Sequence, residues 1–269
     1  MTVCSPRRKG RRMKRPTGVL LDLDGTVWDD DIRLYPGSAD AIASIRDGGL
    51  PVLFATNTTR LTRVVLAERL VERGIPAEPS DVITATQAGV IWLREQGLRR
   101  IAVFLPDRAL PEFDEFELVE EDPDALIVGD LGKGWSFDVM NRIFRLLLVG
   151  PEFLTLHRNK YWKTGGELVL DAGAFVAAFE YATGREARLV GKPGPIQFEA
   201  AAHSLGCEPG DLVMVGDSLD TDIAGGLNAG CTCALVRTGN FSEVRLSKSP
   251  IRPDVVIDSI ADLPSVISA

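Results

Sequence analysis

The sequence predicts an α/β fold in which a doubly wound parallel sheet contains a second, smaller α/β domain as an insertion. Short apolar segments alternate with helical patterns along the chain, which is the βαβα order that builds a parallel sheet. The apolar segments are continuous, as expected for strands that helices cover on both faces. The middle of the chain has strands and helices of its own, so we expect it to form a separate unit.

The larger sheet is predicted to contain the apolar segments 18–23 (GVLLDL), 51–56 (PVLFAT), 211–217 (DLVMVGD), 233–236 (CALV) and 254–257 (DVVI). Two helices are predicted between the early strands. Residues 38–49 offer Ser38 as an N-cap and Gly48 or Gly49 as a stop, and residues 60–74 repeat their apolar positions every three or four residues.

The inserted domain is predicted to span residues 83–187, so that residues 16–82 and 188–269 form the core. Its strands are predicted at 101–105, 125–130, 153–157 and 167–171, and its helices at 84–97, 136–150 and 172–184.

The composition is that of a soluble globular protein, with 45% hydrophobic and 25% charged residues. No apolar run approaches the roughly 18 residues that a membrane span requires. No apolar block of a secretory signal follows the basic start, so we expect a cytoplasmic protein without a membrane partner. Cys207, Cys231 and Cys233 lack the spacing of zinc ligands and are predicted to be reduced thiols in or near the core.

Charge is distributed unevenly along the chain. Seven of the 30 basic residues lie within residues 1–15, which contain no acidic residue. The rest of the chain is strongly acidic, so nucleic acid is not an expected partner. We interpret residues 1–15 as a disordered tail. A true start at Met13, a nucleic-acid arm and an organelle address are the alternatives.

Polar side chains stand at the ends of the predicted strands. Asp22 and Asp24 end the first strand, Thr56 and Asn57 end the second, and Asp217 ends a later one. In an open α/β sheet the ligand binds outside the carboxyl ends of the strands, so these side chains are expected to surround one crevice.

Carboxylates gathered in that crevice repel one another. At about 4 Å and an effective dielectric constant near 20, each like-charge pair costs roughly 4 kcal/mol, so Asp22, Asp24 and Asp217 require a compensating charge. A hard divalent cation supplies it, and carboxylate oxygens with open water positions suit Mg²⁺. Lys192 follows a short apolar piece and precedes a helix, which favours a fixed position for this lysine.

Four motifs occur in order: DLDGT at 22–26, ATN at 55–57, Lys192 within VGKPGP, and VGDSLDTDIAGG at 215–226. Through these motifs the chain resembles the haloacid dehalogenase (HAD) superfamily of phosphohydrolases, subfamily IIA, over nearly everything after residue 16. The resemblance implies a Rossmann-like core and a C2-type cap as the insertion. Segments FRLLLVG, YATG and VGKP resemble the branch that contains phospholysine phosphohistidine inorganic pyrophosphate phosphatase and HAD-like hydrolase domain-containing protein 2.

The first motif is suited to phosphoryl transfer. With a reference pKa near 3.9, Asp22 is ionised at neutral pH, so it is expected to attack phosphorus and form an aspartyl phosphate. Asp24 is expected to protonate the leaving oxygen and later to accept a proton from the attacking water, which requires a raised pKa. Thr56, Asn57 and Lys192 are the expected donors to the phosphoryl oxygens.

The expected metal ligands are Asp22, Asp217 and the backbone carbonyl of Asp24. Asp222 lies near the start of a helix and is expected to bind the metal through a water, although a helix also favours an acid there for structural reasons. Asp220 is expected to cap that helix. The same residues have a purely structural alternative, because Asp-Gly-Thr and Thr-Asn sequences are common in turns and loops.

Substrate choice is expected to depend on the cap, which closes over the crevice. Residues 157–166 (HRNKYWKTGG), among them Lys160, form either a clamp for an anionic substrate or a solvated hairpin tip. Thr58 is assigned to substrate binding with Thr56, Asn57 and Lys192. It stands where many C2-capped proteins have a second asparagine, so their sugar-phosphate specificity does not carry over.

These observations predict a Mg²⁺-dependent phosphatase for a small phosphorylated metabolite, namely a phosphomonoester, a phosphoramidate or pyrophosphate. Transfer to an acceptor other than water is the enzymatic alternative. A regulatory protein phosphorylated on Asp22 is the non-enzymatic one, although such a protein needs neither Asp24 nor a cap. His157 and His203 share no motif with a serine or cysteine nucleophile, which argues against a catalytic triad. A homodimer is compatible with the sequence.

Overall fold

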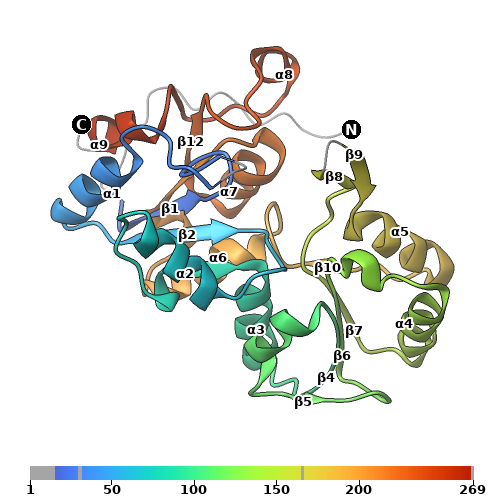
Figure 1. Cartoon of the computed structure of the whole chain (residues 1–269). Helices are drawn as coiled ribbons and strands as arrows, with labels where there is room; N and C mark the ends of the chain where they lie inside the picture. The colour runs from blue at the N-terminus through green and yellow to red at the C-terminus, as the bar shows by residue number, and fades with distance from the viewer. Residues whose placement is uncertain (1–15, 30–31, 165–166, 268–269) are drawn as a thin grey trace.

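Two lobes make up the protein (Figure 1). The computed structural model describes residues 16–29, 32–164 and 167–267. One lobe contains the first and the last of the described elements, and the other contains the middle of the chain. The basic segment 1–15, for which a disordered tail is predicted, lies outside the described residues.

A six-stranded parallel sheet forms the first lobe. Its strands, in spatial order, are β13 (Val255–Ile257), β12 (Thr232–Val236), β11 (Leu212–Gly216), β1 (Gly18–Asp22), β2 (Val52–Thr56) and β3 (Val82–Thr84). The first described strand, β1, is central; β2 and β3 follow on one side of it, and β11, β12 and β13 lie on the other. The predicted doubly wound parallel sheet is therefore confirmed, and its strand order reverses at β1.

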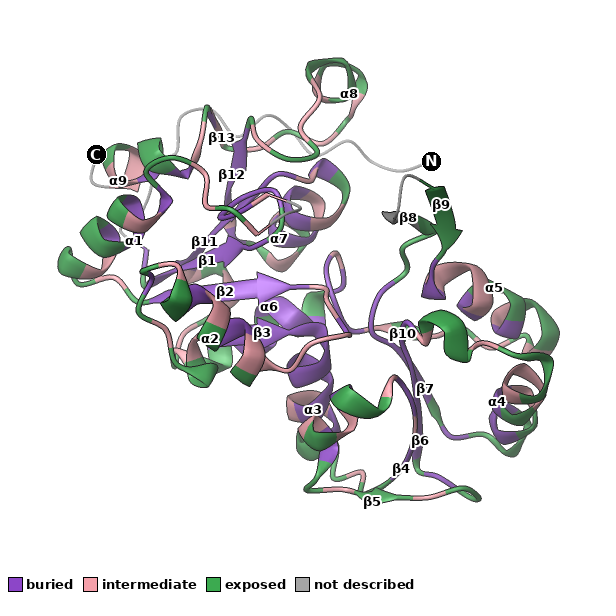
Figure 2. Ribbon diagram, in the orientation of Figure 1, coloured by how far each residue is buried: buried purple, intermediate pink, exposed green. Residues whose placement is uncertain are grey.

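Helices cover both faces of this sheet (Figure 2). They are α1 (Ser38–Asp47), α2 (Arg63–Glu72), α3 (Ala85–Glu95), α6 (Pro195–Ser204), α7 (Ala224–Ala229) and α9 (Leu263–Ile267). Helix α8 (Glu243–Lys248) has no buried residue and projects from this lobe. Successive strand residues point to opposite faces, so Leu20 packs with α3 and α6 whereas Val19 and Leu21 pack with α1 and α2. All of β1 is buried, which explains its continuous apolar sequence.

The first turn of α1 differs from the prediction. Gly37, with a φ of 80°, occupies the N-cap position. Ser38 is buried, and its hydroxyl donates to the carbonyl of Val27 at 3.1 Å. The serine therefore ties the helix to the loop after β1 and does not cap it. Gly48 ends the helix, as predicted.

The second lobe is built on a five-stranded parallel sheet with the order β10 (Arg188–Leu189), β7 (Glu152–Thr155), β6 (Ala125–Val128), β4 (Arg100–Phe104) and β5 (Glu117–Leu118). Helices α4 (Phe137–Val149) and α5 (Ala172–Thr183) pack on it. Strands β8 (Tyr161–Thr164) and β9 (Glu167–Leu170) form an antiparallel hairpin, so the strand predicted at 167–171 pairs outside the parallel sheet. Residues 165–166 of the predicted clamp segment lie outside the described residues.

The two lobes are joined through their apolar interior. The inserted domain was predicted to begin at residue 83, but β3 extends to Thr84 and pairs in the first sheet. The core was predicted to resume at residue 188, but β10 begins there and pairs in the second sheet. Helix α3 packs against α6, and its buried Leu93 belongs to the same cluster as Phe113 of the second lobe. The interface is therefore a continuous apolar contact.

Short 3-10 helices lie at Pro79–Asp81, Asp107–Phe113, Gly132–Gly134, Pro209–Asp211 and Ile260–Asp262, and a π-helical turn lies at Leu219–Ile223. Cys207 is half-buried, Cys231 and Cys233 are buried, and all three are free thiols, as predicted. Within the described part of the chain, no helix has both the length and the apolar character that a membrane span demands.

Candidate active site

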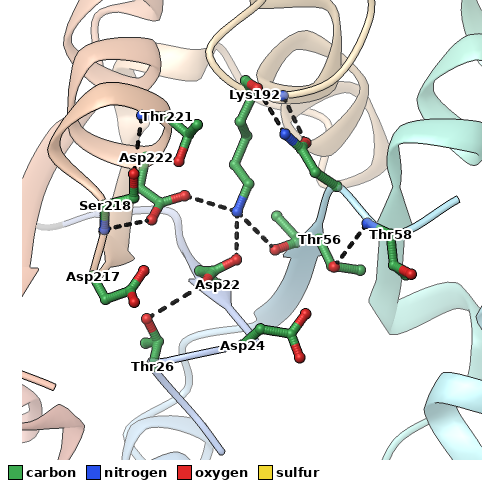
Figure 3. A network of polar contacts seen from close by, with 12 residues as sticks. Asp22, Asp24, Thr26, Thr56, Thr58, Lys192, Asp217, Ser218, Thr221 and Asp222 are labelled. Atoms are coloured by element: carbon green, nitrogen blue, oxygen red, sulfur yellow. Dashed lines mark hydrogen bonds and ion pairs between the residues drawn. The ribbon is translucent and has the colours of Figure 1, made fainter. Parts of the chain in front are cut away.

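The carboxyl end of β1 lies where the strand order reverses, and it carries Asp22 (Figure 3). Asp22 is the last residue of the strand and is buried. The hydroxyl of Thr26, four residues later in the turn, donates to its Oδ2 at 3.4 Å. The turn therefore returns toward the strand end and leaves the other carboxylate oxygen, Oδ1, for a partner from elsewhere in the chain.

That partner is the buried side chain of Lys192. Its Nζ lies 2.5 Å from Asp22 Oδ1 and 2.8 Å from Asp222 Oδ1, and it donates to the carbonyl of Ala55 at 3.1 Å (Figure 3). The lysine side chain is only 3% exposed. Burial of an ammonium group is costly unless charged acceptors compensate it, and here two carboxylates do so.

Two amide side chains hold the backbone of Lys192. Asn57 accepts a hydrogen bond from the lysine N–H at 2.9 Å and donates one to its carbonyl at 2.7 Å. Gln197 accepts from the same N–H at 3.0 Å and donates to the carbonyls of Thr56 and Ile83 at 3.0 and 2.7 Å. Asn57, an expected substrate donor, therefore positions the lysine. Gln197 was not predicted, and its only sequence signal is a polar residue in the first turn of an apolar helix.

The loop after β11 supplies two further carboxylates. Asp222 is buried, and its Oδ2 accepts from the N–H of Ser218 at 3.0 Å. The hydroxyl of Ser218 accepts in turn from the N–H of Thr221 at 3.4 Å, so the serine caps this helical turn. The prediction of Asp220 as the cap is wrong, because Asp220 is exposed and pairs with Arg245.

Asp217 is held by a residue that the sequence did not indicate. Both the backbone N–H and the side-chain amide of Asn240 donate to Asp217 Oδ2, at 2.6 and 3.1 Å. Gly25 has a φ of +89°, and a Cβ at Gly25 or Gly239 would collide with the same oxygen. The two glycines therefore allow the backbone to approach this carboxylate closely.

Three carboxylates converge at this point. One oxygen from each of Asp22, Asp217 and Asp222 lies within 4.8 Å of the other two. These three acids face the ammonium of Lys192, so negative charge is in excess when all are ionised. Oxygen donors with net negative charge suit a hard divalent cation, and the three side chains therefore fit a metal site. The backbone carbonyl of Asp24 stays a predicted fourth ligand.

The crowding of carboxylates changes their acidity. Burial raises the pKa of Asp22 well above its ordinary value, Lys192 opposes this rise, and the charges of Asp222 and Asp217 add to it. Burial and the charge of Asp222 raise the pKa of Asp217 to about 7, against the hydrogen bonds from Asn240. Burial acts to lower the pKa of Lys192, but Asp22 and Asp222 raise it above its ordinary value. A bound dication would favour the ionised carboxylates.

Asp24 lies apart from the three converging carboxylates (Figure 3). Its side chain is exposed, and the indole N–H of the buried Trp28 donates to its Oδ1 at 2.7 Å. Thr56 is the last residue of β2, and its hydroxyl accepts from the N–H of Thr58 at 3.1 Å. Asp24 and both threonines line the same cavity as Asp22.

This cavity has a volume of about 400 Å³, which suits a small metabolite. The second lobe contributes Asp130, His157, Asn159 and Asp171 to its wall. His157 and Asn159 belong to the predicted clamp segment 157–166, whereas Asp130 and Asp171 were not predicted as site residues. Lys160, the predicted cap contact, has an exposed side chain and is not among the described residues that line the cavity.

Family models match two parts of the chain. A haloacid dehalogenase-like hydrolase model matches residues 19–119, and a HAD-hydrolase-like model matches residues 189–263. Haloacid dehalogenase-like hydrolase domain-containing protein 2 from Bos taurus is 35% identical, over 83% of this chain and 85% of that protein. Phospholysine phosphohistidine inorganic pyrophosphate phosphatase from Homo sapiens is 31% identical, over 94% of each chain.

Solved structures share the same fold. NagD from E. coli superimposes with a TM-score of 0.84 at 29% identity, covering 93% of this chain and 98% of that one. A 4-nitrophenylphosphatase from Thermotoga maritima gives a TM-score of 0.86 at 26% identity, covering 94% and 98%. With relatives of this similarity along most of its length, the chain belongs to the haloacid dehalogenase-like hydrolase family, subfamily IIA.

Proposed function

We propose that this hydrolase removes phosphate from a small phosphorylated metabolite, using a bound Mg²⁺ ion and a covalent aspartyl phosphate on Asp22. The observation that carries the proposal is the convergence of Asp22, Asp217 and Asp222 at the wall of one cavity, where the ammonium of Lys192 contacts Asp22 and Asp222. Structural carboxylates rarely converge in this way, because the repulsion between them lowers stability.

The residues have distinct roles in this mechanism. Asp22 attacks phosphorus and displaces the leaving group, whose oxygen or nitrogen takes a proton from Asp24. Asp24 then accepts a proton from the water that hydrolyses the aspartyl phosphate. Lys192 donates to a phosphoryl oxygen and holds Asp22 in place, while Thr56 and Thr58 lie on the cavity wall where they are able to contact the phosphate.

Mg²⁺ held by Asp22 and Asp217, and through a water by Asp222, supplies positive charge that offsets the negative charge developing on the phosphoryl oxygens. The excess of carboxylates in the site supports this assignment.

The cavity and the names of the relatives support a proposal for the substrate class. A volume of about 400 Å³ accommodates a small metabolite. The names of the similar proteins include a 4-nitrophenylphosphatase and a phospholysine phosphohistidine inorganic pyrophosphate phosphatase. We therefore propose a phosphomonoester, a phosphoramidate or pyrophosphate as the substrate. A cytoplasmic location and a homodimer stay predictions.

Asp22→Asn tests the proposed function. The amide is not a nucleophile, so release of phosphate from para-nitrophenyl phosphate in Mg²⁺ is expected to fall by at least about a thousandfold. Asp220→Asn is the matched control, because Asp220 lies on the same acidic loop but is exposed and paired with Arg245. Equal release by wild type and Asp22→Asn contradicts the proposal.

Product analysis separates the alternatives. Added glycerol is expected to leave free phosphate as the main product, whereas glycerol phosphate as the main product favours a phosphotransferase. A stable phosphate on Asp22 without turnover favours a regulatory protein.

A further inference from the structure

The second-lobe wall of the cavity contains a buried histidine that the proposed reaction does not use. His157 follows β7 and is only 3% exposed. The hydroxyl of Thr155 donates to the His157 carbonyl at 2.9 Å, which fixes the backbone at this point. His157 lines the cavity together with Asp22 and Asp24, so a substrate bound at Asp22 shares one cavity with the imidazole.

The two ring nitrogens of His157 have different surroundings. Nε2 lies 3.8 Å from Oδ1 of the buried Asp171. Asp171 is itself fixed, because it caps α5 and accepts from the N–H of Ala172 at 2.7 Å. Nδ1 is buried as well, but no hydrogen-bond partner for it exists among the described residues. One nitrogen therefore faces a carboxylate, and the other needs a ligand to satisfy it.

The protonation state determines what kind of ligand that is. Burial lowers the pKa of His157, while Asp171 and Asp130 act to raise it and Arg60 adds to the lowering. The imidazole is therefore neutral at neutral pH. A neighbouring carboxylate favours the proton on the nearer nitrogen, Nε2, which leaves a lone pair on Nδ1. A buried acceptor without a donor is unfavourable, so the ligand must bring an N–H or O–H group.

Charge on the same wall restricts the ligand further. Asp130 and Asp171 both line the cavity. Arg60 donates to Asp130 Oδ2 at 2.6 Å, so its guanidinium group is already engaged with a carboxylate. Arg60 also lines the cavity, but the carboxylate of Asp130 offsets its charge, so the described residues of this wall keep the negative charge of Asp171. This charge would repel an anionic leaving group and would not repel a neutral or cationic one.

We propose that His157, oriented by Asp171, is a specificity-determining residue that accepts a hydrogen bond from an N–H or O–H group of the leaving group. This inference rests on the proposed function and narrows its substrate class. It favours phosphate esters and phosphoramidates whose leaving group is neutral or cationic and carries a donor. It disfavours pyrophosphate, whose leaving group is an anion.

Three substrates that share a three-carbon chain test the inference: propyl phosphate, 3-hydroxypropyl phosphate and 3-aminopropyl phosphate. The kcat/KM for phosphate release by wild type is expected to be roughly tenfold or more higher with the hydroxyl or amine than with the propyl compound. In His157→Leu this ratio is expected to fall to about one, mainly because KM rises for the hydroxyl and amine compounds. His157→Asn presents an amide oxygen near the position of Nδ1 and is expected to recover part of the ratio.

His203→Leu is the control, because His203 is an exposed histidine of α6. It is expected to keep the wild-type ratio. Equal kcat/KM for the three substrates in wild type, or a ratio that His157→Leu leaves unchanged, overturns the inference. If the leucine variant does not fold, the comparison of the three substrates in wild type and in His157→Asn still tests the inference. If wild type releases no phosphate from these compounds or from para-nitrophenyl phosphate, both the proposed function and this inference are overturned, whereas release without preference overturns the inference alone.

Discussion

Lys192 supplies the positive charge that lets Asp22 and Asp222 lie side by side in the interior. Its Nζ contacts both carboxylates, and amide side chains fix its backbone. Removing one member of a buried ionic group leaves the remaining charges without compensation, which is more unfavourable than the absence of the whole group.

Lys192→Met is therefore expected to lower the free energy of unfolding by about 3 kcal/mol at neutral pH, as measured by urea denaturation without metal. Methionine preserves most of the apolar volume, so the loss reports mainly on charge. Mg²⁺ is expected to restore part of the stability, because the cation replaces the missing positive charge. Lys248→Met, on the exposed surface of α8, is the control. A Lys192→Met protein as stable as wild type contradicts this assignment.

Asp217 is expected to link the proposed metal binding to pH. Its pKa is raised from 3.8 to about 7 in the folded protein. Without metal, the folded protein holds a proton that the unfolded chain releases, so this contribution to stability is complete below about pH 4 and is lost as the pH rises to about 7. The same proton competes with a cation for the carboxylate.

The increase in Tm on adding Mg²⁺ is therefore expected to be larger at about pH 8 than at about pH 6. Asp217→Asn is expected to reduce both the increase and its pH dependence, and differential scanning fluorimetry measures them. An increase of the same size at both pH values is inconsistent with competition between proton and metal.

Sequence motifs identified the residues that carry charge at the site, but not those that position them. Asp22, Lys192, Asp217 and Asp222 stand at strand ends or in recognisable motifs. Gln197, by contrast, acts through contacts with residues far away in the chain, such as Ile83, which is 114 positions earlier. A local pattern contains no information about such partners.

At the scale of the element, the turn after β1 brings two loops into contact. Gly25 and Gly239 lie against Asp217, and the hydroxyl of Thr238 donates to the Gly25 carbonyl at 2.5 Å. A side chain at Gly25 would need both an unfavourable φ and the space that the Asp217 carboxylate fills.

Gly25→Ala is expected to destabilise the protein more than Gly49→Ala. Gly49 has a φ of +80°, and no atom lies within 4 Å of an added Cβ. Gly49→Ala is therefore expected to lose only the roughly 1 kcal/mol that a non-glycine residue costs in the left-handed region. Only Gly25→Ala is also expected to weaken Mg²⁺ binding in isothermal titration calorimetry, because it displaces Asp217. Equal losses of stability with unchanged Mg²⁺ affinity would show that the contact is unimportant.

Strands and helices were predictable from the sequence where their buried residues form a recognisable apolar pattern. Strand β2 lies within one residue of its prediction because both of its faces are covered. Strands β5 and β10 have two residues each and β3 has three, which is too short for a recognisable pattern. The N-terminus of α1 was misassigned because the Ser38 hydroxyl bonds to Val27 in a different element.

At the scale of the molecule, the two lobes enclose the cavity between them. Arg60 of the first lobe pairs with Asp130 of the second, and the Asp130 N–H donates to the hydroxyl of Thr59 at 3.4 Å. These contacts lie at the cavity, and the apolar cluster that contains residues of both lobes adds to the contact between them. The inserted lobe is thereby held over Asp22, where it limits access of water to the reacting phosphate.

Carboxylates from two distant segments, β1 and the loop after β11, are proposed to share one divalent cation. Crystals grown with Mn²⁺, which binds the same oxygen donors as Mg²⁺, test it through anomalous scattering. We predict one strong peak bounded by the carboxylates of Asp22, Asp217 and Asp222, and its loss in Asp217→Asn. A map without a peak there, or with manganese bound only elsewhere, would contradict the account.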